Sequence, residues 1–170
     1  MNDRQFEAIL CAVITVSDTR TRETDRSGAL ICERLESMGH HLHLRKIIPD
    51  DYETIQQSVD ECIKTSDLDV VILTGGTGIT RRDITPDAIR PLSTKHIPGF
   101  GELFRWLSFG EIGASTIQSR ADAWLCDSTL VFALPGSSGA VQLAMDKILV
   151  EQLDVRTRPC NFIQLLPRIR

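Results

Sequence analysis

Apolar, β-branched runs alternate along this chain with segments that carry apolar residues at every third or fourth position. A strand buried on both faces of a parallel sheet is apolar nearly throughout, whereas a strand with one exposed face alternates in polarity. On this basis we predict four strands, over residues 6–16, 40–48, 68–74 and 129–134. The second alternates, and the other three are mostly apolar.

The segments between these runs are predicted to be helices. In residues 24–39, Ile31 and Leu35 belong to one apolar stripe, and Gly39 is placed to end the helix. Further helices are predicted over residues 50–66, 85–89, 100–109, 115–124 and 135–153.

Strand and helix alternate nearly throughout, so the predicted fold class is α/β: a three-layer, mostly parallel sheet flanked by helices on both faces. The sequence contains no internal repeat or low-complexity linker, and we expect residues 1–170 to form a single domain. In such sheets ligands bind beyond the carboxyl ends of the strands, where the chain direction switches. Four loops leave those ends, at residues 17–25, 49–51, 75–83 and 135–139.

The composition is that of an ordinary globular chain. A net charge of −4 and a pI near 5.5 argue against general nucleic-acid or membrane-surface binding, which favours a basic face. No apolar stretch has the length of a spanning helix, and the N-terminus lacks the apolar core of a signal peptide. The five cysteines show no C-x-x-C spacing, so we expect reduced, mostly buried thiols in a cytoplasmic protein.

The third strand is followed by a glycine-rich loop, TGGTGITRRD. Gly75, Gly76 and Gly78 permit positive φ angles and leave backbone N–H groups uncovered, so that a phosphate can approach closely. The spacing and the lysine of a Walker-type phosphate loop are missing. A tight turn without a ligand explains the same pattern equally well.

Two acidic positions lie at the same predicted edge. Asp83 follows the glycines and Asp50 follows the second strand, and either carboxylate can hold Mg²⁺ together with substrate phosphates. By pattern alone the simpler explanations are favoured: a solvated charge at Asp83, and helix capping by Asp50 with Glu53. At the short helix we expect Thr85 as N-cap and Pro86 as the first helical residue.

The remaining polar features each have two explanations. Ser137 and Ser138 in LPGSSG suit an anion site or ordinary N-capping. The charged loop SDTRTRETD is long enough to be functional, and a mobile solvated loop is an equal alternative. We assign three histidines to a solvated strand edge rather than to a metal site: His40, His41 and His43. We assign three aromatic residues to the core or an interface: Phe104, Trp106 and Phe109.

Several motifs together resemble the molybdopterin-binding MoaB/Mog family. In chain order the main four are LTGGTGITRRDITPDA, IPGFGELFR, IGASTIQSRA and LPGS, and TVSDTR and IIPDD fit the same pattern. The resemblance covers nearly the whole chain and implies a role in molybdenum cofactor biosynthesis. Active members of the family are molybdopterin adenylyltransferases, which use Mg²⁺ and ATP to join AMP to the terminal phosphate of molybdopterin and release pyrophosphate.

The resemblance also implies site residues and partners. Asp50 and Asp83 match the family's two important carboxylates, so they are expected to be catalytic and to bind Mg²⁺. Ten residues are expected to bind substrate or phosphate: Ser17, Asp18, Gly75, Gly76, Thr77, Gly78, Pro135, Gly136, Ser137 and Ser138. A homotrimer or a hexamer is implied as well, as are contacts with other molybdenum cofactor biosynthesis proteins.

Two alternatives differ in class. The ending LDVRTRPCNF resembles the MoaB branch, in which some members have lost activity, so a non-catalytic molybdopterin-binding carrier or scaffold is the second hypothesis. The retained Asp50 and Asp83 favour the enzyme. A flavodoxin-like FMN binder would have the same architecture, but its first loop would be rich in glycine and hydroxyl groups, and SDTRTRETD is heavily charged.

Overall fold

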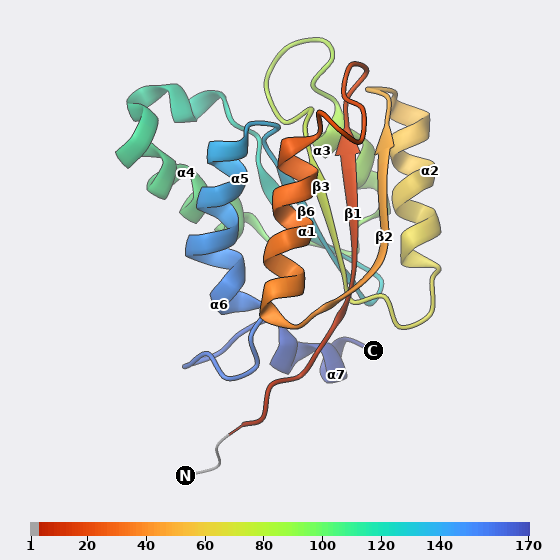
Figure 1. The fold of residues 1–170 in the computed structure, drawn as a ribbon, viewed down its shortest axis with the longest axis vertical. Coiled ribbons are helices and arrows are strands. Elements are labelled where there is room, and N and C mark those ends of the chain that lie inside the picture. The colour runs from red at the N-terminus through yellow and green to blue at the C-terminus, as the bar shows by residue number, and fades with distance from the viewer. Residues whose placement is uncertain (1–3) are drawn as a thin grey trace.

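The computed structural model describes residues 4–170, which form one six-stranded sheet with helices on both faces (Figure 1). In chain order the elements are β1 (Leu10–Val16), α1 (Arg26–Met38), β2 (His41–Ile48), α2 (Tyr52–Ile63), β3 (Val70–Thr74), α3 (Thr85–Ile89), β4 (Lys95–His96), α4 (Pro98–Ile112), β5 (Asp122–Cys126), β6 (Thr129–Leu134), α5 (Ser138–Ala144), α6 (Val150–Gln152) and α7 (Leu166–Ile169). Between α5 and α6 the chain stays helical through a π-helical segment, Met145–Leu149.

The strand order in the sheet is β2-β1-β3-β6-β5-β4. The first four strands are mutually parallel, and β5 runs antiparallel to both β6 and β4. This confirms the predicted α/β class with a mostly parallel sheet. β1 pairs with β2 on one side and β3 on the other, so the direction of chain progression reverses between β1 and β3.

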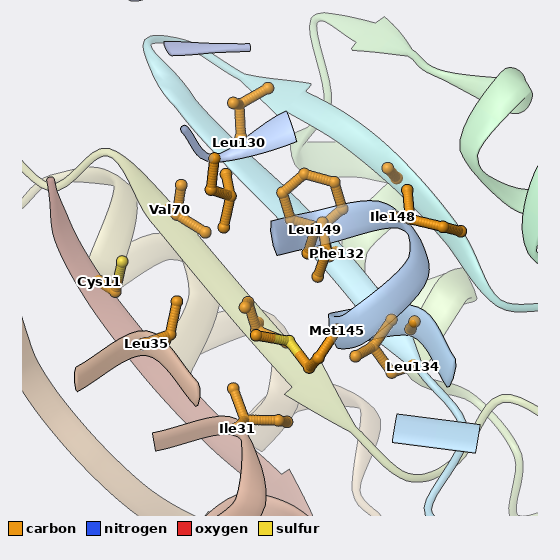
Figure 2. Packing of buried hydrophobic residues seen from close by; sticks show 14 of the residues in the cluster. Cys11, Ile31, Leu35, Val70, Leu130, Phe132, Leu134, Met145, Ile148 and Leu149 are labelled. Atoms are coloured by element: carbon orange, nitrogen blue, oxygen red, sulfur yellow. The ribbon is translucent and has the colours of Figure 1, made fainter. Parts of the chain in front are cut away.

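Alternate side chains of the central strands enter two separate apolar cores. On one face, Val70 of β3 and Phe132 of β6 pack against α1, α4 and the α5–α6 segment, and Figure 2 shows Phe132 beside Leu149. On the other face, Val71 of β3 packs against α2 and α3. Period-two alternation within a strand therefore produces the three layers, because both faces of the sheet are covered.

The predicted helix over residues 115–124 is wrong. Gly113–Gln118 forms a 3₁₀ turn, and Asp122–Cys126 is strand β5. β5 is buried because it pairs with β6, with Ala123 in one core and Trp124 in the other. This segment is a strand because it pairs with a strand close to it in sequence. Its apolar run is too short to show a periodicity that would distinguish a strand from a helix. The two-residue strand β4 was not predicted.

Other elements differ from prediction mainly at their ends. Residues 6–9 of the predicted first strand precede the sheet, since β1 begins at Leu10. Gly39 ends α1 as expected, with φ of 95°. Thr85 is the first residue of α3 rather than its N-cap, and the cap position belongs to Ile84, which makes no side-chain capping bond.

The histidine assignment holds only in part, and of the three aromatic residues assigned to the core or an interface one is in the core. His41 and His43 are exposed, but His40 is buried and stacks on Phe6, so it does not belong to a solvated edge. Phe104 is in the core. Trp106 is 73% exposed, so no other part of residues 4–170 covers its side chain. Four cysteines are buried and one, Cys160, is exposed.

Candidate functional site

The carboxyl ends of β1, β2, β3 and β6 lie at one edge of the sheet, and the loops that leave them gather there (Figure 1). The four predicted loops therefore share this edge. The loops after β1 and β3 flank the point where the chain direction reverses. In open parallel sheets this is where ligands bind.

The loop after β3 has a backbone path that requires glycine. Gly75 and Gly76 have φ angles of 106° and 65°. A Cβ on Gly75 would lie 2.3 Å from Val16 O. The Gly75 N–H donates to Leu134 O at 3.0 Å, and the Thr85 hydroxyl donates to Gly75 O at 2.9 Å. These bonds hold the glycine loop in one conformation against β6 and α3.

The turn after β6 packs directly on the glycine loop. A Cβ on Gly136 would lie 3.4 Å from Gly75 Cα, so the two backbones are in close contact. The Thr74 hydroxyl donates to Pro135 O at 2.9 Å. Ser137 is the N-cap of α5, because its side chain accepts the N–H of the residue three positions later. Capping by Ser137, one of the two predicted explanations, is therefore present.

Asp83 folds back onto its own loop. Its Oδ2 accepts the Thr80 N–H at 2.9 Å and the Thr80 hydroxyl at 2.6 Å. A Cβ on Gly78 would lie 2.8 Å from the same oxygen. Partial burial opposes ionisation, but these hydrogen bonds and one from the Gly78 N–H outweigh it and lower the pKa of Asp83. Asp83 is therefore a fixed, ionised carboxylate.

Asp50 is in the opposite situation, because the predicted capping role belongs to its neighbour. Asp51 is the N-cap of α2, and its Oδ2 accepts the Thr54 N–H at 2.9 Å. The Asp50 carboxylate makes no hydrogen bond or ion pair with residues 4–170, and its Oδ1 lies 3.4 Å from where a Cβ on Gly76 would be. Partial burial and then the charge of Asp83 raise its pKa.

The first loop reaches this cluster through Asp18. Its Oδ1 accepts the Asp50 N–H at 3.0 Å, and its Oδ2 forms an ion pair with Arg82. Ser17 lies at the end of β1, where its N–H donates to Ile48 O at 2.8 Å and its hydroxyl accepts two N–H groups of its own loop. Asp18 thus connects the loops after β1, β2 and β3.

Arg120 was missed by the sequence reasoning and is the most connected side chain of the site. Its Nε donates to Gly78 O at 2.7 Å, its Nη1 donates to Asp87 at 2.8 Å, and its Nη2 donates to Asp83 O. Its own N–H donates to Thr77 O at 2.7 Å. The motif IGASTIQSRA contributes to the family resemblance, but the contacts of its arginine are with segments far away in sequence and cannot be predicted from the motif.

A cavity of about 450 Å³ opens beside the glycine loop. Eight of the predicted site residues line it: Gly75, Gly76, Thr77, Gly78, Asp83, Pro135, Gly136 and Ser137. Phe104 and Ile112 of α4 supply its apolar side, and Ser108 lies between them in the sequence of that helix. Four predicted residues are outside its lining: Ser17, Asp18, Asp50 and Ser138. Ser138 instead lines a neighbouring cavity that shares Gly136 and Ser137 with this one.

Residues 4–170 contain no cluster of three or more His, Cys, Asp or Glu side chains placed to hold a metal ion. None of their helices combines the length and the apolar character needed to cross a membrane. Any metal bound here by the two aspartates would need further ligands, from a substrate or from water.

Comparison with known proteins identifies the family. The family described as "Probable molybdopterin binding domain" matches residues 12–155. Molybdenum cofactor biosynthesis protein B of Bacillus subtilis is 50% identical over 148 residues, which cover 86% of this chain and 87% of that protein. The Escherichia coli K12 protein of the same name is 46% identical over 158 residues, 93% of each chain. A crystal structure of a protein with this name has a TM-score of 0.88 and 42% identity, and the match covers 98% of both chains.

Fold and sequence together place the protein in the α/β class of molybdopterin-binding domains. The chain belongs to this family, whose members serve molybdenum cofactor biosynthesis. The expected resemblance to MoaB/Mog proteins is confirmed.

Proposed function

We propose that this protein is a molybdopterin adenylyltransferase: it binds molybdopterin and Mg-ATP, joins AMP to the terminal phosphate of molybdopterin and releases pyrophosphate. The observation that carries the proposal is the placement of Asp50 and Asp83 against Gly76 and Gly78 of one glycine loop. Two carboxylates from separate strand ends thus border one loop, in which Gly76 has a positive φ and Gly78 does not.

The two aspartates suit a bound Mg²⁺. The Asp50 carboxylate has no cationic or hydrogen-bonding partner within residues 4–170, and partial burial and then the charge of Asp83 raise its pKa. A divalent cation would relieve this repulsion, and Mg²⁺ commonly takes one or two carboxylates together with phosphate oxygens and water. When bound, it would neutralise charge on the phosphates of ATP as the pyrophosphate leaves.

The chain itself needs to supply orientation rather than a general base. A terminal phosphate oxygen of molybdopterin is already anionic, and it forms a bond to the α-phosphorus of ATP while the bond from that phosphorus to the pyrophosphate oxygen breaks. The N–H groups of Gly76 and Thr77, which have no hydrogen-bond partner within residues 4–170, would hold phosphate oxygens in line for this displacement, whereas those of Gly75 and Gly78 already donate to Leu134 O and to Asp83. The apolar wall from Phe104 and Ile112 would exclude water from the reacting groups.

Pyrophosphate release tests the proposal. We expect the purified chain to release pyrophosphate from ATP only when both Mg²⁺ and molybdopterin are present, and Asp83→Asn to lower this rate by about 100-fold or more. Asp60→Asn is the matched control, because Asp60 pairs with Lys64 on the surface of α2. Equal rates for the wild type and Asp83→Asn would refute the catalytic role.

The second candidate is a carrier that binds molybdopterin without turnover. It is favoured by the family match, which concerns a molybdopterin-binding domain and is satisfied by binding alone. Tight molybdopterin binding that is unaffected by ATP and Mg²⁺, with no pyrophosphate release, would support the carrier and exclude the enzyme.

We also propose that residues 1–170 act as a single cytoplasmic domain that assembles into a homotrimer or hexamer. Support comes from apolar side chains exposed on α4 and the following turn: Leu103, Trp106, Phe109, Ile112 and Ile117. Exposed apolar patches of this kind mark contacts with other proteins, including other molybdenum cofactor biosynthesis proteins. Light scattering of the wild type and Trp106→Glu tests the assembly, and an unchanged mass would remove Trp106 from the interface.

A further inference from the structure

A second cavity lies beside the glycine-loop cavity and contains arginines. It has a volume of about 330 Å³ and lies between the loop after β1, the start of α1 and the turn after β6. Its lining consists of Arg20, Glu23, Thr24, Arg26, Ser27, Gly136, Ser137 and Ser138. We propose that this arginine cavity is a separate binding site for a polyphosphate group, namely pyrophosphate or the outer phosphates of a nucleoside triphosphate.

The two arginines are available to an anion. Arg20 donates Nη1 to Thr24 O at 3.3 Å, and its other donors stay open. The Arg26 side chain, at the first position of α1, makes no hydrogen bond or ion pair with any residue of 4–170. Guanidinium groups form paired, charge-assisted hydrogen bonds with phosphate oxygens.

Nearby acidic groups do not cancel this charge. Glu23 lines the cavity and offsets one of the two arginines, while its Oε2 accepts the Thr21 hydroxyl at 2.7 Å. Asp25 is buried at the N-cap of α1, where Arg45 pairs with it at 2.9 Å and the Thr15 hydroxyl donates to it. The two arginines and one glutamate that line the cavity therefore leave a net positive charge, and the hydroxyls of Ser137 and Ser138 add neutral donors, whereas the Ser27 hydroxyl donates to Asp25.

The position of the arginine cavity gives it a role in the proposed reaction. Gly136 and Ser137 line both cavities, so the two sites are separated by one short turn. Adenylylation brings two phosphorylated substrates together and must hold two anionic groups at once. One phosphate group would lie on the amides of the glycine loop and the other between Arg20 and Arg26. This step of the inference rests on the proposed function, whereas polyphosphate binding itself does not.

Titration calorimetry of the full chain with inorganic pyrophosphate, without Mg²⁺, tests the site. We expect the double variant Arg20→Gln/Arg26→Gln to weaken binding by about tenfold or more, since two charge-assisted contacts are lost. Arg22→Gln is the matched control: it removes the same charge from the same loop, but Arg22 lines cavities on the other side of the loop. Its affinity should stay within about twofold of the wild type. Glu23→Gln should bind a few-fold more tightly, because a negative charge leaves the lining.

Two further arms locate the site and identify the ligand. Pyrophosphate should perturb the amide resonances of residues 23–27 and 136–138, with little effect on residues 77–83. ATP should lose affinity in the double variant as pyrophosphate does, whereas inorganic monophosphate should bind weakly to both proteins. Equal weakening in Arg22→Gln and in the double variant would refute the site, and so would an absence of pyrophosphate binding by the wild type.

Asp83→Asn separates this inference from the proposed function. It should abolish pyrophosphate release yet leave Mg²⁺-free pyrophosphate binding unchanged, because Asp83 does not line the arginine cavity. If pyrophosphate binding depends on the two arginines but no turnover occurs, the proposed enzyme activity is refuted and the polyphosphate site is supported. If turnover depends on Asp83 but the two arginines have no effect on pyrophosphate binding, the polyphosphate site is refuted and the enzyme activity is supported.

Discussion

The loops after β3 and β1 border the same site, yet they are held in opposite ways. The glycine loop, residues 75–83, is bonded to β6 through Leu134, to α3 through Thr85 and to Arg120. Between residues 19 and 24 the first loop is exposed, and its hydrogen bonds run within the loop itself. The glycine loop is rigid and would contact a ligand through its backbone, whereas the first loop presents charged side chains that can adjust to a ligand.

The largest effect is expected from Gly75→Ala. The new Cβ would meet Val16 O at 2.3 Å in a backbone conformation with φ of 106°, so the loop must move. We expect a loss of about 2–4 kcal/mol of stability and of measurable activity. Chemical denaturation measures the first and pyrophosphate release the second. Gly110→Ala is the control: its Cβ meets nothing within 4 Å on α4, and the change should be neutral or slightly stabilising. Normal stability of Gly75→Ala would mean that the loop is not rigid.

Arg120→Lys should have the next largest effect. A lysine cannot donate to Gly78 O, Asp83 O and Asp87 together, so the glycine loop loses its clamp. We expect about 1–3 kcal/mol of destabilisation and a fall in kcat of roughly 10- to 100-fold.

The control for the clamp is Arg105→Lys. Arg105 also donates to backbone carbonyls, those of Ser119 and Ala121, but it does not contact the glycine loop. It should lose stability with little change in kcat. A similar fall in kcat for both variants would show that Arg120 acts only through general stability.

Asp50 and Asp83 should respond to neutralisation in opposite directions when Mg²⁺ is absent. The pKa of Asp83 is lowered by folding, so its ionised form stabilises the protein above its unfolded pKa, and this is lost as the pH falls through the folded pKa. The pKa of Asp50 is raised, so its ionisation destabilises the folded state as the pH rises through the unfolded and then the folded value.

At about pH 7, Asp83→Asn should therefore be less stable than the wild type and Asp50→Asn more stable, each by no more than about 1 kcal/mol because solvent screens both groups. Thermal unfolding should show both differences shrinking at about pH 3, where carboxylates protonate. Both variants should lose activity. Shifts in the same direction at neutral pH would contradict the contrast between the two carboxylates.

The smallest effect is expected in the first loop. Thr21→Ala removes hydrogen bonds to Glu23 and Thr24 that stay within an exposed segment. Stability should change by less than about 0.5 kcal/mol, since solvent replaces these partners. A larger loss in thermal unfolding would mean that this loop is as rigid as the glycine loop.

The fold was predictable where local patterns agree with tertiary pairing. The apolar runs of β1, β3 and β6 and the helical stripes of α1 and α2 were found with their order, because each is long enough to show its period. Strand β5 was not found. Residues 122–126 are short and buried on both faces, so only the pairing with β6 distinguishes them from a helix.

The residues that gather at the candidate site were predictable from the sequence, and their contacts were less so. Asp50 and Asp51 offer the same helix two adjacent carboxylates, and the pattern favoured the wrong one as its cap. The extended backbone at Asp51 brings its side chain to Thr54 N–H, and this leaves Asp50 without a partner beside the glycine loop. Neighbours in sequence cannot decide between them.

The sequence by itself determined the chain order of strands β1, β2, β3 and β6, the positive φ of Gly39, Gly75 and Gly76, and the acidic residues at the strand ends, because each depends on a residue and its near neighbours. Only the tertiary structure decided that Arg120 clamps the glycine loop, that Asp50 faces Gly76 and that Arg20 and Arg26 line one cavity. These contacts join segments that lie far apart in the chain, and they form only when the sheet fixes the distances between its loops.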